Sequence, residues 1–401
     1  MEKYLHVFVN AFWNEGSGIT GGDKRVIEIL KKWKQNEKLE FSIIIYAPQK
    51  FLDLLVNENI DYVEFRCTAS KGSEKRGLIF SYICRTFRAL RLIPHHDTNV
   101  HCFYSTSDYF PDVIPCVLGK VLNKKAEWIA LVHNIYEHYK TRPGNKTMNF
   151  ISYSLQQFSL FLMKGKSDRV LVVSPLVKYY LIDKKKFYKK KIQRVNNGVD
   201  TAFIDSIVPW EDKAKHYDAV ILARLAPVKG IYDLPVIWKK VMNKDSSARL
   251  AIIGGGTDEI KNELLKQCDH HGVRNNIDLL GYFEPELSYR YLKSAKVFVF
   301  TSRTEGWGIS IAEAMACELP VVAYNLPIYK YVFPKGIKLI ENRDAEQMSE
   351  QIVDLLNNPK EREKLGEDGR QYVQEHYEWS KVADNEINII KGVHREHSFK
   401  K

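Results

Sequence analysis

The chain has 401 residues and a formal net charge of +11, with 45% hydrophobic and 27% charged residues. This is the composition of a soluble globular protein, and the length predicts two or three domains. The six cysteines show no C-x-x-C spacing, which argues against a zinc site or a disulfide framework. We find no secretory h-region and no apolar run long enough to span a bilayer, so we expect a cytoplasmic protein.

The positive charge is concentrated in the first half of the chain. Residues 1–200 hold 32 Lys and Arg against 19 Asp and Glu, whereas residues 201–401 hold 28 against 30. A basic half joined to a near-neutral half predicts that one domain faces an anionic partner. A membrane, a nucleic acid and a phosphorylated acceptor are all open at this point.

Strands and helices alternate along the chain, with one helix predicted at 23–33 and another from Pro175. The strands predicted in the first half are His6–Asn10, Phe41–Ala47, Val63–Arg66, His101–Ser105, Trp128–His133 and Arg169–Ser174. Those predicted in the second half are Ala219–Ala223, Arg249–Gly254, Ile277–Leu280, Val297–Thr301, Pro320–Ala323 and Gly336–Ile340. The alternation predicts an α/β fold of two doubly wound parallel-sheet domains facing across a cleft, with ligands at the carboxyl ends of the strands.

The polar, strand-free segment Trp210–His216 indicates a domain boundary nearby. We expect residues 1–205 plus 378–401 to form the N-terminal domain, with the last helix returning to it. Residues 206–377 would form the C-terminal domain.

The stretch from Val297 to Cys317 is predicted to be a buried strand, a glycine turn and a helix that begins near Ile309. The free N–H groups of Gly308, Ile309 and Ser310 would then point into the turn, where they suit a phosphate.

Two acids flank this turn. Glu305 precedes it, where a carboxylate could merely complement the positive end of the helix. Glu313 lies among Ala and Ile, where a buried carboxylate is costly unless it meets donors, and a ribose diol would supply two. We favour a functional role for both, more strongly for Glu313.

Two cationic residues lie near the start of the predicted C-terminal domain. Arg224 follows a predicted strand, and Lys229 begins the next helix. Arg would bind a diphosphate through paired hydrogen bonds and Lys as a point charge. The alternative for Lys229 is a solvated helix face.

Other motifs are weaker. His133 ends a predicted strand, where it is either structural or on the ligand side of the sheet. Gly16-Ser-Gly18-Ile-Thr-Gly21 matches a dinucleotide-binding pattern, but the required acid after the second strand is missing. We therefore expect a loop whose backbone approaches a phosphate or a sugar, and the alternative is a plain tight turn. No Asp-x-Asp occurs, so no divalent metal is expected.

The basic half contains two apolar helical segments. Helix 78–93 is predicted to place its apolar residues on one face and its arginines opposite: Ile79, Ile83, Phe87, Leu90 and Ile93 against Arg85, Arg88 and Arg91. Met148–Met163 is strongly apolar and precedes lysines. Taken singly, each segment is predicted to be a helix with one face in the core and the other in solvent. Taken together with the positive charge of this half, the two segments also predict a surface that binds an anionic membrane. Nucleic acid is not expected, because no binding motif accompanies the charge.

The chain resembles the retaining GT-B glycosyltransferases of family 4 type along nearly its whole length. The most specific match is the run from Glu305 to Glu313, Glu-Gly-Trp-Gly-Ile-Ser-Ile-Ala-Glu. Weaker matches are Gly21-Gly22, His133, Val172–Pro175, Asn197–Asp200, Arg224, Lys229-Gly230, Gly254 and Leu280-Gly281. The chain departs from the family pattern at Asn134, Glu318 and Asn325–Lys330.

This resemblance implies a nucleotide-diphospho-sugar bound by the C-terminal domain and an acceptor bound by the N-terminal domain. The catalytic residues would be Glu305 at the donor sugar, His133 near the reacting sugar, and Arg224 and Lys229 at the diphosphate. The donor-binding residues would be Glu313 at the ribose, the backbone of Gly308, Ile309 and Ser310, and Gly21, Gly22, Gly254, Gly281 and Tyr282. It implies no metal, and no cofactor besides the nucleotide sugar as co-substrate.

The implied reaction is transfer of a hexosyl group, with retained anomeric configuration, to a hydroxyl of a lipid-linked or cell-surface glycan. Two alternatives are a non-catalytic nucleotide-sugar-binding subunit and a nucleotide-sugar epimerase on the same scaffold. We expect a cytoplasmic location, with peripheral attachment to the inner face of the cell membrane as a further hypothesis.

Overall fold

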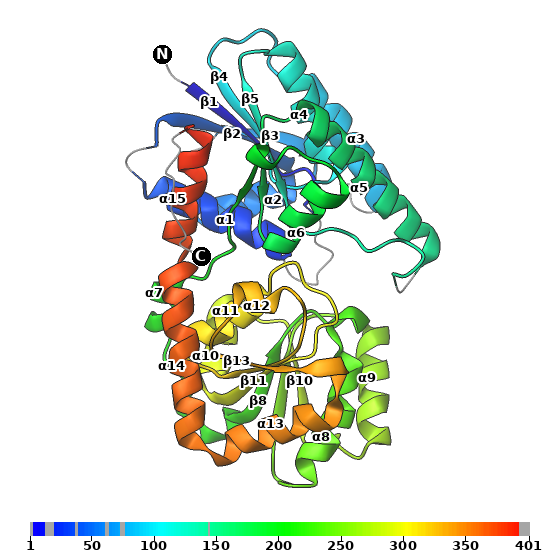
Figure 1. The fold of residues 1–401 in the computed structure, drawn as a ribbon, viewed down its shortest axis with the longest axis vertical. Helices are drawn as coiled ribbons and strands as arrows, with labels where there is room; N and C mark the ends of the chain where they lie inside the picture. Colours follow the sequence, from blue (N-terminus) through cyan, green and yellow to red (C-terminus); the bar gives the residue numbers. More distant parts are fainter. Residues whose placement is uncertain are drawn as a thin grey trace. The chain divides into compact units, whose positions relative to one another are not determined.

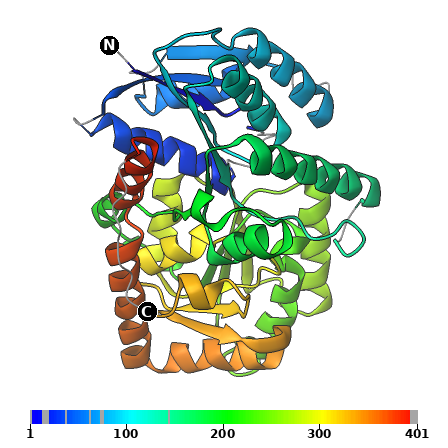
Figure 2. The ribbon, with the colours of Figure 1, turned by 45° about the horizontal axis from the view of Figure 1, so that its top comes forward.

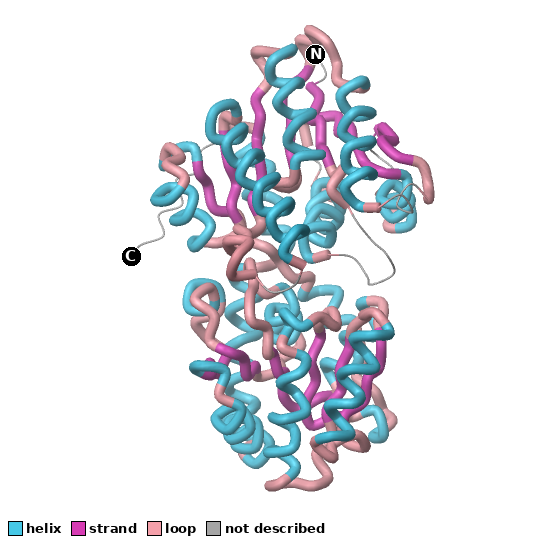
Figure 3. The backbone as a smooth tube through the Cα atoms, turned by 90° about the vertical axis from the view of Figure 1, so that its right-hand side faces the viewer, coloured by secondary structure: helices cyan, strands magenta, loops and turns pink. Residues whose placement is uncertain are grey.

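The computed structural model describes residues 3–12, 20–36, 39–60, 64–72, 77–142 and 145–392. They form two compact units. Unit 1 runs to Asn196 and resumes at Trp379, and unit 2 comprises Asn197–Glu378. In both units, strands alternate with flanking helices (Figure 3).

The described part of unit 1 contains a sheet of seven parallel strands in the order β3-β2-β1-β4-β5-β6-β7. The strands are β1 Lys3–Phe8, β2 Phe41–Pro48, β3 Glu64–Ala69, β4 Val100–Ser105, β5 Glu127–Val132, β6 Arg169–Val172 and β7 Ile192–Arg194. Its helices are α1 Gly21–Lys34, α2 Gln49–Asn57, α3 Leu78–Arg91, α4 Phe110–Leu122, α5 Lys146–Lys166, α6 Pro175–Tyr179 and α15 Trp379–Ile390 (Figure 1).

The described part of unit 2 contains six parallel strands in the order β10-β9-β8-β11-β12-β13. The strands are β8 Tyr217–Leu222, β9 Leu250–Ile253, β10 Ile277–Gly281, β11 Ala295–Phe300, β12 Val321–Tyr324 and β13 Ile337–Ile340. Its helices are α7 Thr201–Ser206, α8 Leu234–Met242, α9 Asp258–His270, α10 Pro285–Lys293, α11 Ile309–Ala316, α12 Tyr329–Val332, α13 Ala345–Asn357 and α14 Pro359–His376.

The predicted pair of doubly wound parallel sheets is therefore confirmed. Central strands such as β5 and β12 are buried on both faces, which is why they read as unbroken apolar runs. Strand β7 was not predicted, because this three-residue strand lies directly after Lys189–Lys191 and has no apolar periodicity of its own.

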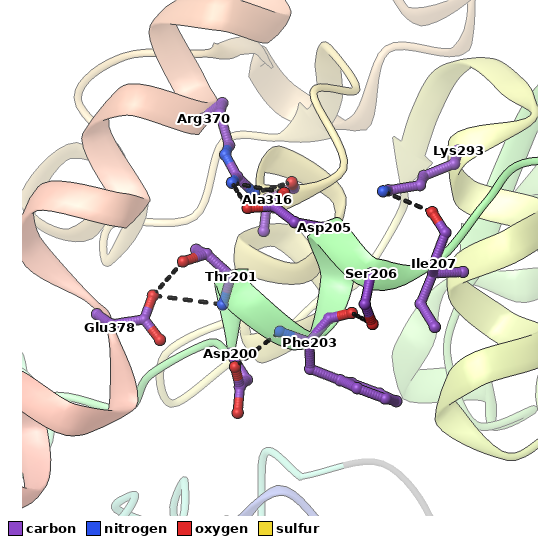
Figure 4. Close-up of polar contacts among 10 residues, drawn as sticks. All are labelled: Asp200, Thr201, Phe203, Asp205, Ser206, Ile207, Lys293, Ala316, Arg370 and Glu378. Atoms are coloured by element: carbon purple, nitrogen blue, oxygen red, sulfur yellow. Dashed lines mark hydrogen bonds and ion pairs between the residues drawn. The ribbon is translucent and has the colours of Figure 1, made fainter.

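The division between the units falls nine residues before the predicted one, after Asn196 rather than after residue 205. The short helix α7 explains the difference, because its side chains bond only within unit 2 among the contacts drawn in Figure 4. Glu378 accepts hydrogen bonds from the backbone N–H and the hydroxyl of Thr201. Arg370 donates to both carboxylate oxygens of Asp205, each at 2.7 Å.

The C-terminal helix α15 packs against α1 in unit 1 (Figure 2). A buried ion pair joins Arg25 of α1 to Glu386 of α15, and the Tyr104 hydroxyl donates to the same carboxylate at 2.7 Å. The indole of Trp33 donates to the carbonyl of Ala383 at 3.1 Å. Since a buried charge is costly unless it is paired, these contacts specify where α15 docks.

The predicted faces of helix α3 are only partly right. Arg88 and Arg91 are exposed and Ile93 is buried, as predicted, but three other residues lie on the opposite side. Arg85, expected on the solvent face, is fully buried and donates to the backbone carbonyls of Asn10 at 3.0 Å and Phe12 at 2.5 Å. Ile83 and Phe87, expected in the core, are exposed. Arg85 thus satisfies two loop carbonyls from the inner side of the helix, and Ile83 and Phe87 lie on its exposed side.

In the described part of the chain, no helix is both long and apolar enough to cross a bilayer.

Because of His6 in β1, the stability of unit 1 is expected to depend on pH. Its ring lies in the core, 2.9 Å from the Tyr46 hydroxyl, and burial lowers its pKa from 6.5 to about 3, with the charge of Arg66 adding to the effect. Below pH 6.5 the unfolded chain therefore binds a proton that the native state does not. Stability is lost as the pH falls, by about 1 kcal/mol near pH 5.5.

We predict that His6→Gln removes this part of the acid destabilisation. Urea unfolding followed by circular dichroism at neutral pH and near pH 5.5 measures it. The free energy of unfolding should fall less steeply in the variant than in the wild type. Equal slopes would show that His6 is not held neutral by the fold.

Candidate active site

The loops after β8, β9, β10 and β11 are joined at the carboxyl edge of the unit 2 sheet. The N–H of Gly254 donates to the Gly281 carbonyl at 2.8 Å, and the N–H of Leu225 to the Gly255 carbonyl at 2.8 Å. A Cβ on Gly254 would lie 1.8 Å from the carbonyl oxygen of Ala223. Glycine is therefore required at Gly254 because two backbones meet there, and the sequence-predicted Gly281 lies at the same junction.

Gly230 makes a second close approach, between the loop after β8 and the end of β11. Its φ is +66°, and a Cβ would lie 2.0 Å from the carbonyl oxygen of Thr301. The Thr301 hydroxyl donates to the carbonyl of Lys229 at 3.0 Å, and the N–H of Arg303 donates to Val228 at 2.9 Å. These contacts fix the backbone that carries Lys229.

Lys229 and Glu305, predicted separately from the sequence, form an ion pair. Both side chains are mostly buried, at 21% and 12% exposure. Arg224 lies on the same loop, is exposed, and makes no hydrogen bond or ion pair with other described residues. One cation is thus already paired while the other is open to an anion.

The N-terminus of α11 presents the expected donors. The helix begins at Ile309, and its first carbonyl, that of Gly308, accepts from the N–H of Ile311 at 3.1 Å. The N–H groups of Gly308, Ile309 and Ser310 have no acceptor among the hydrogen bonds of the described residues. Gly308 has a φ of +104°, a conformation that favours glycine. Unsatisfied donors at a helix N-terminus suit an anion.

Glu313 lies one turn into α11 and is buried, with 5% exposure. The Tyr289 hydroxyl of α10 donates to its Oε1 at 2.9 Å. Tyr289 was not predicted as a site residue, because no motif surrounds it and it contacts Glu313 from a separate helix.

Tyr329 of α12 was also missed as a candidate. Its hydroxyl is buried and has no hydrogen-bond partner among the described residues, and its ring packs beside the position of Gly308. Burial, with the charge of Glu305 adding to the effect, raises the pKa of Tyr329 well above its ordinary value. It lies in the segment Asn325–Lys330, where the sequence departs from the family pattern. Tyr282, a predicted donor-binding residue, is exposed immediately after β10.

A separate group of predicted residues lies in unit 1. His133 follows β5, and its Nε2 lies 2.8 Å from the Thr106 carbonyl, so Nε2 carries the proton and Nδ1 is the acceptor. Burial, with the charge of Arg25 adding to the effect, lowers the pKa of His133 to about 4. A Cβ on Gly22 would lie 3.4 Å from the His133 ring, which places the first turn of α1 against it.

Gly21 is the first residue of α1, next to Gly22. The preceding Gly16 and Gly18 lie outside the described residues.

No group of three or more His, Cys, Asp or Glu side chains in the described ranges is arranged to hold a metal ion. A cavity of about 760 Å³ adjoins the loop after β8, lined by Pro227, Tyr232 and the first part of α9. Glu259 and Glu263 line it against a single Lys266, so it is poorly suited to a diphosphate.

The family model for "Glycosyl transferases group 1" matches residues 202–372. The chain is 28% identical to the poly(ribitol-phosphate) alpha-N-acetylglucosaminyltransferase of Staphylococcus aureus, over 47% of this chain and 38% of that protein. It is 30% identical to the GDP-mannose-dependent monoacylated alpha-(1-6)-phosphatidylinositol monomannoside mannosyltransferase of Corynebacterium glutamicum, over 42% of this chain and 45% of that protein. The chain thus spans less than half the length of each of these two relatives.

The fold is similar to that of Anabaena Alr3699/HepE, whose crystal structure is in complex with UDP and glucose. The TM-score is 0.75 at 13% identity, covering 98% of this chain and all of the other.

The close approach at Gly230 can be tested with a matched pair of variants. Gly230 and Gly272 have nearly the same φ, +66° and +67°, but a Cβ on Gly272 would meet nothing within 4 Å. Gly272→Ala should cost only the backbone strain, about 1 kcal/mol. Gly230→Ala should lose a further ~1–3 kcal/mol through overpacking. Equal losses in thermal unfolding would contradict the contact with Thr301.

Proposed function

We propose that the chain, of which residues 202–372 match the glycosyl transferases group 1 family, is a retaining hexosyltransferase that uses a nucleotide-diphospho-sugar. Its two units have the GT-B fold. The observation that carries the proposal is the grouping of Arg224, Lys229 and the open N-terminus of α11 at one sheet edge.

This grouping suits a departing diphosphate. When the bond between sugar and diphosphate breaks, negative charge grows on the phosphate and positive charge on the sugar ring. Lys229, held by Glu305, and the N–H groups of Gly308–Ser310 are fixed before the reaction and oppose the negative charge without reorganising, and Arg224 would join them from the same loop. The unit thus supplies electrostatic stabilisation from its own side chains and backbone, and we propose that no metal ion is required.

Glu305 serves two roles in this proposal. In the free protein its carboxylate pairs with Lys229 and holds the ammonium group at the sheet edge. With a donor bound, the diphosphate would share Lys229, and Glu305 would accept a hydrogen bond from a hydroxyl of the donor sugar. Glu313, oriented by Tyr289, would accept from the ribose.

The acceptor would bind to unit 1, near His133. Because its pKa is lowered to about 4, His133 is neutral at physiological pH, and Nδ1 can accept a hydrogen bond from a sugar or acceptor hydroxyl. We assign no covalent nucleophile. The acceptor oxygen would attack on the face that the diphosphate leaves, and the leaving phosphate would take its proton, which retains the anomeric configuration.

We propose a lipid-linked or cell-surface glycan as the acceptor. The two relatives named above act, by their names, on poly(ribitol phosphate) and on a phosphatidylinositol mannoside. We propose a cytoplasmic location for the reaction, and the free thiols of all six cysteines are compatible with a reducing compartment.

A panel of nucleotide sugars, with turnover followed by NMR, tests the proposal. Slow release of nucleoside diphosphate and free hexose without acceptor supports a transferase. An isomerised nucleotide sugar would indicate an epimerase, and binding without any turnover would indicate a non-catalytic subunit.

We predict that Arg224→Ala weakens binding of the nucleoside diphosphate by about tenfold or more, since it removes a charged hydrogen-bond donor. Calorimetry measures this loss. Lys261→Ala, which removes an exposed lysine paired with Asp258 on α9, is the matched control and should bind as the wild type does. Equal affinity of Arg224→Ala and the control would remove Arg224 from the site.

We predict that Glu305→Gln lowers turnover by about a hundredfold while changing nucleoside diphosphate affinity much less. The glutamine keeps the shape but loses the charge that orients Lys229 and accepts from the donor sugar. Initial rates and calorimetry on the same preparation separate the two effects. Wild-type turnover in the variant would exclude the assigned role.

A further inference from the structure

Helices α3, α4 and α5 lie side by side over one side of the unit 1 sheet (Figures 1 and 2). Their inner sides share a core with the strands, through residues such as Ala89, Val113, Cys116, Leu160 and Met163. Their outer sides carry several exposed apolar side chains as well as lysines and arginines. Exposed apolar patches rimmed by polar residues mark interaction sites.

The exposed apolar residues fall on stripes with helical spacing. On α3 they include Ile83 and Phe87, which are 41% and 62% exposed. On α5, Phe158 and Phe161 are 49% and 72% exposed, one turn apart. We call these two stripes, together with the exposed Val121 of α4, the apolar surface of unit 1. Helix α4 contacts both α3 and α5.

The exposed charge on the three helices themselves is positive, and Asp168, just after α5, pairs with Lys120 of α4. Exposed cations lie along or just after the three helices, and none of them makes an ion pair with another described residue: Arg88, Arg91, Lys124, Lys125, Lys146, Lys164 and Lys166. Asp112 is the one acid in the sequence of the three helices, and it is buried, with hydrogen bonds from the Asn10 N–H at 2.6 Å and the Ser107 hydroxyl at 2.5 Å.

More lysines adjoin the C-terminal end of α5. The ammonium of Lys191 donates to the carbonyls of Met163 and Lys164, each at 3.0 Å. This contact brings the segment Lys189–Lys191 to the end of the helix that carries Phe158 and Phe161.

We propose that the apolar surface of unit 1 inserts into the interfacial region of an anionic lipid bilayer. Phenylalanine and isoleucine side chains would enter the boundary between head groups and acyl chains, and the surrounding Lys and Arg would meet lipid phosphates. The observed charge favours lipid over a second copy of this chain, because a symmetric contact would bring like-charged faces together. This inference is independent of the proposed transfer reaction.

Flotation with vesicles of phosphatidylcholine, with and without phosphatidylglycerol, tests the proposal on the full chain. The wild type should float with the anionic vesicles at low salt and be released at high salt. F87S/F161S should lower the bound fraction by about tenfold or more, because each phenylalanine contributes through its buried apolar area. K164Q/K166Q should weaken binding and reduce its dependence on salt.

Val208→Ser, at an exposed valine of unit 2, is the control for loss of apolar area. Its bound fraction should equal that of the wild type. F87S/F161S should also keep the wild-type melting temperature and nucleoside diphosphate affinity, because both side chains are exposed. Loss of vesicle binding with donor binding intact would therefore separate this proposal from the proposed function.

Phe161→Trp gives a positive signal that does not depend on loss of binding. The fluorescence of the introduced indole should shift to the blue with anionic vesicles and be quenched by brominated lipid chains, relative to the wild-type background. Wild-type binding by F87S/F161S, or floated Phe161→Trp protein whose added fluorescence is not quenched, would overturn the proposal. So would a dimer that forms in solution and disappears in F87S/F161S, because the apolar surface would then be an interface between copies.

Discussion

The candidate site of unit 2 depends on backbone segments that approach closer than any side chain allows. At Gly230 and Gly254, a Cβ would overlap a carbonyl oxygen of the neighbouring loop. Because these loops touch directly, Lys229 and Glu305, which are 76 residues apart in sequence, meet as an ion pair. Charge placed on such a rigid support needs no rearrangement when an anion arrives, and this is the condition under which fixed charges lower a reaction barrier.

In the same site, one cation is paired with a carboxylate and another is available to bind an anion. The ammonium of Lys229 is held by Glu305, whereas Arg224 remains exposed on the same loop. An incoming diphosphate therefore meets one open cation and one that it must share. Glu313 is treated differently, since burial and the Tyr289 hydroxyl hold it in place from a neighbouring helix.

Unit 1 is constrained instead by buried polar groups. Arg25 and Glu386 fix the returning helix α15, and Arg85 satisfies the carbonyls that follow β1. With Arg85 on the inner side of α3, Ile83 and Phe87 of the same helix are exposed. An interior that uses an arginine to satisfy backbone carbonyls therefore lies under an outer side that carries both apolar and basic residues.

The sequence by itself determined the two parallel sheets, the glycine turn before α11, and the residue types that gather at strand ends. These follow from local patterns: unbroken apolar runs for buried strands, and glycines where a chain must turn sharply. Only the tertiary structure decided which long-range partners meet. It paired Lys229 with Glu305, placed Tyr289 on Glu313, and left the Tyr329 hydroxyl buried without a partner among the described residues. It also placed Arg85 inside and Phe87 outside, because periodicity locates an apolar stripe but does not reveal that two carbonyls distant in sequence accept hydrogen bonds from Arg85.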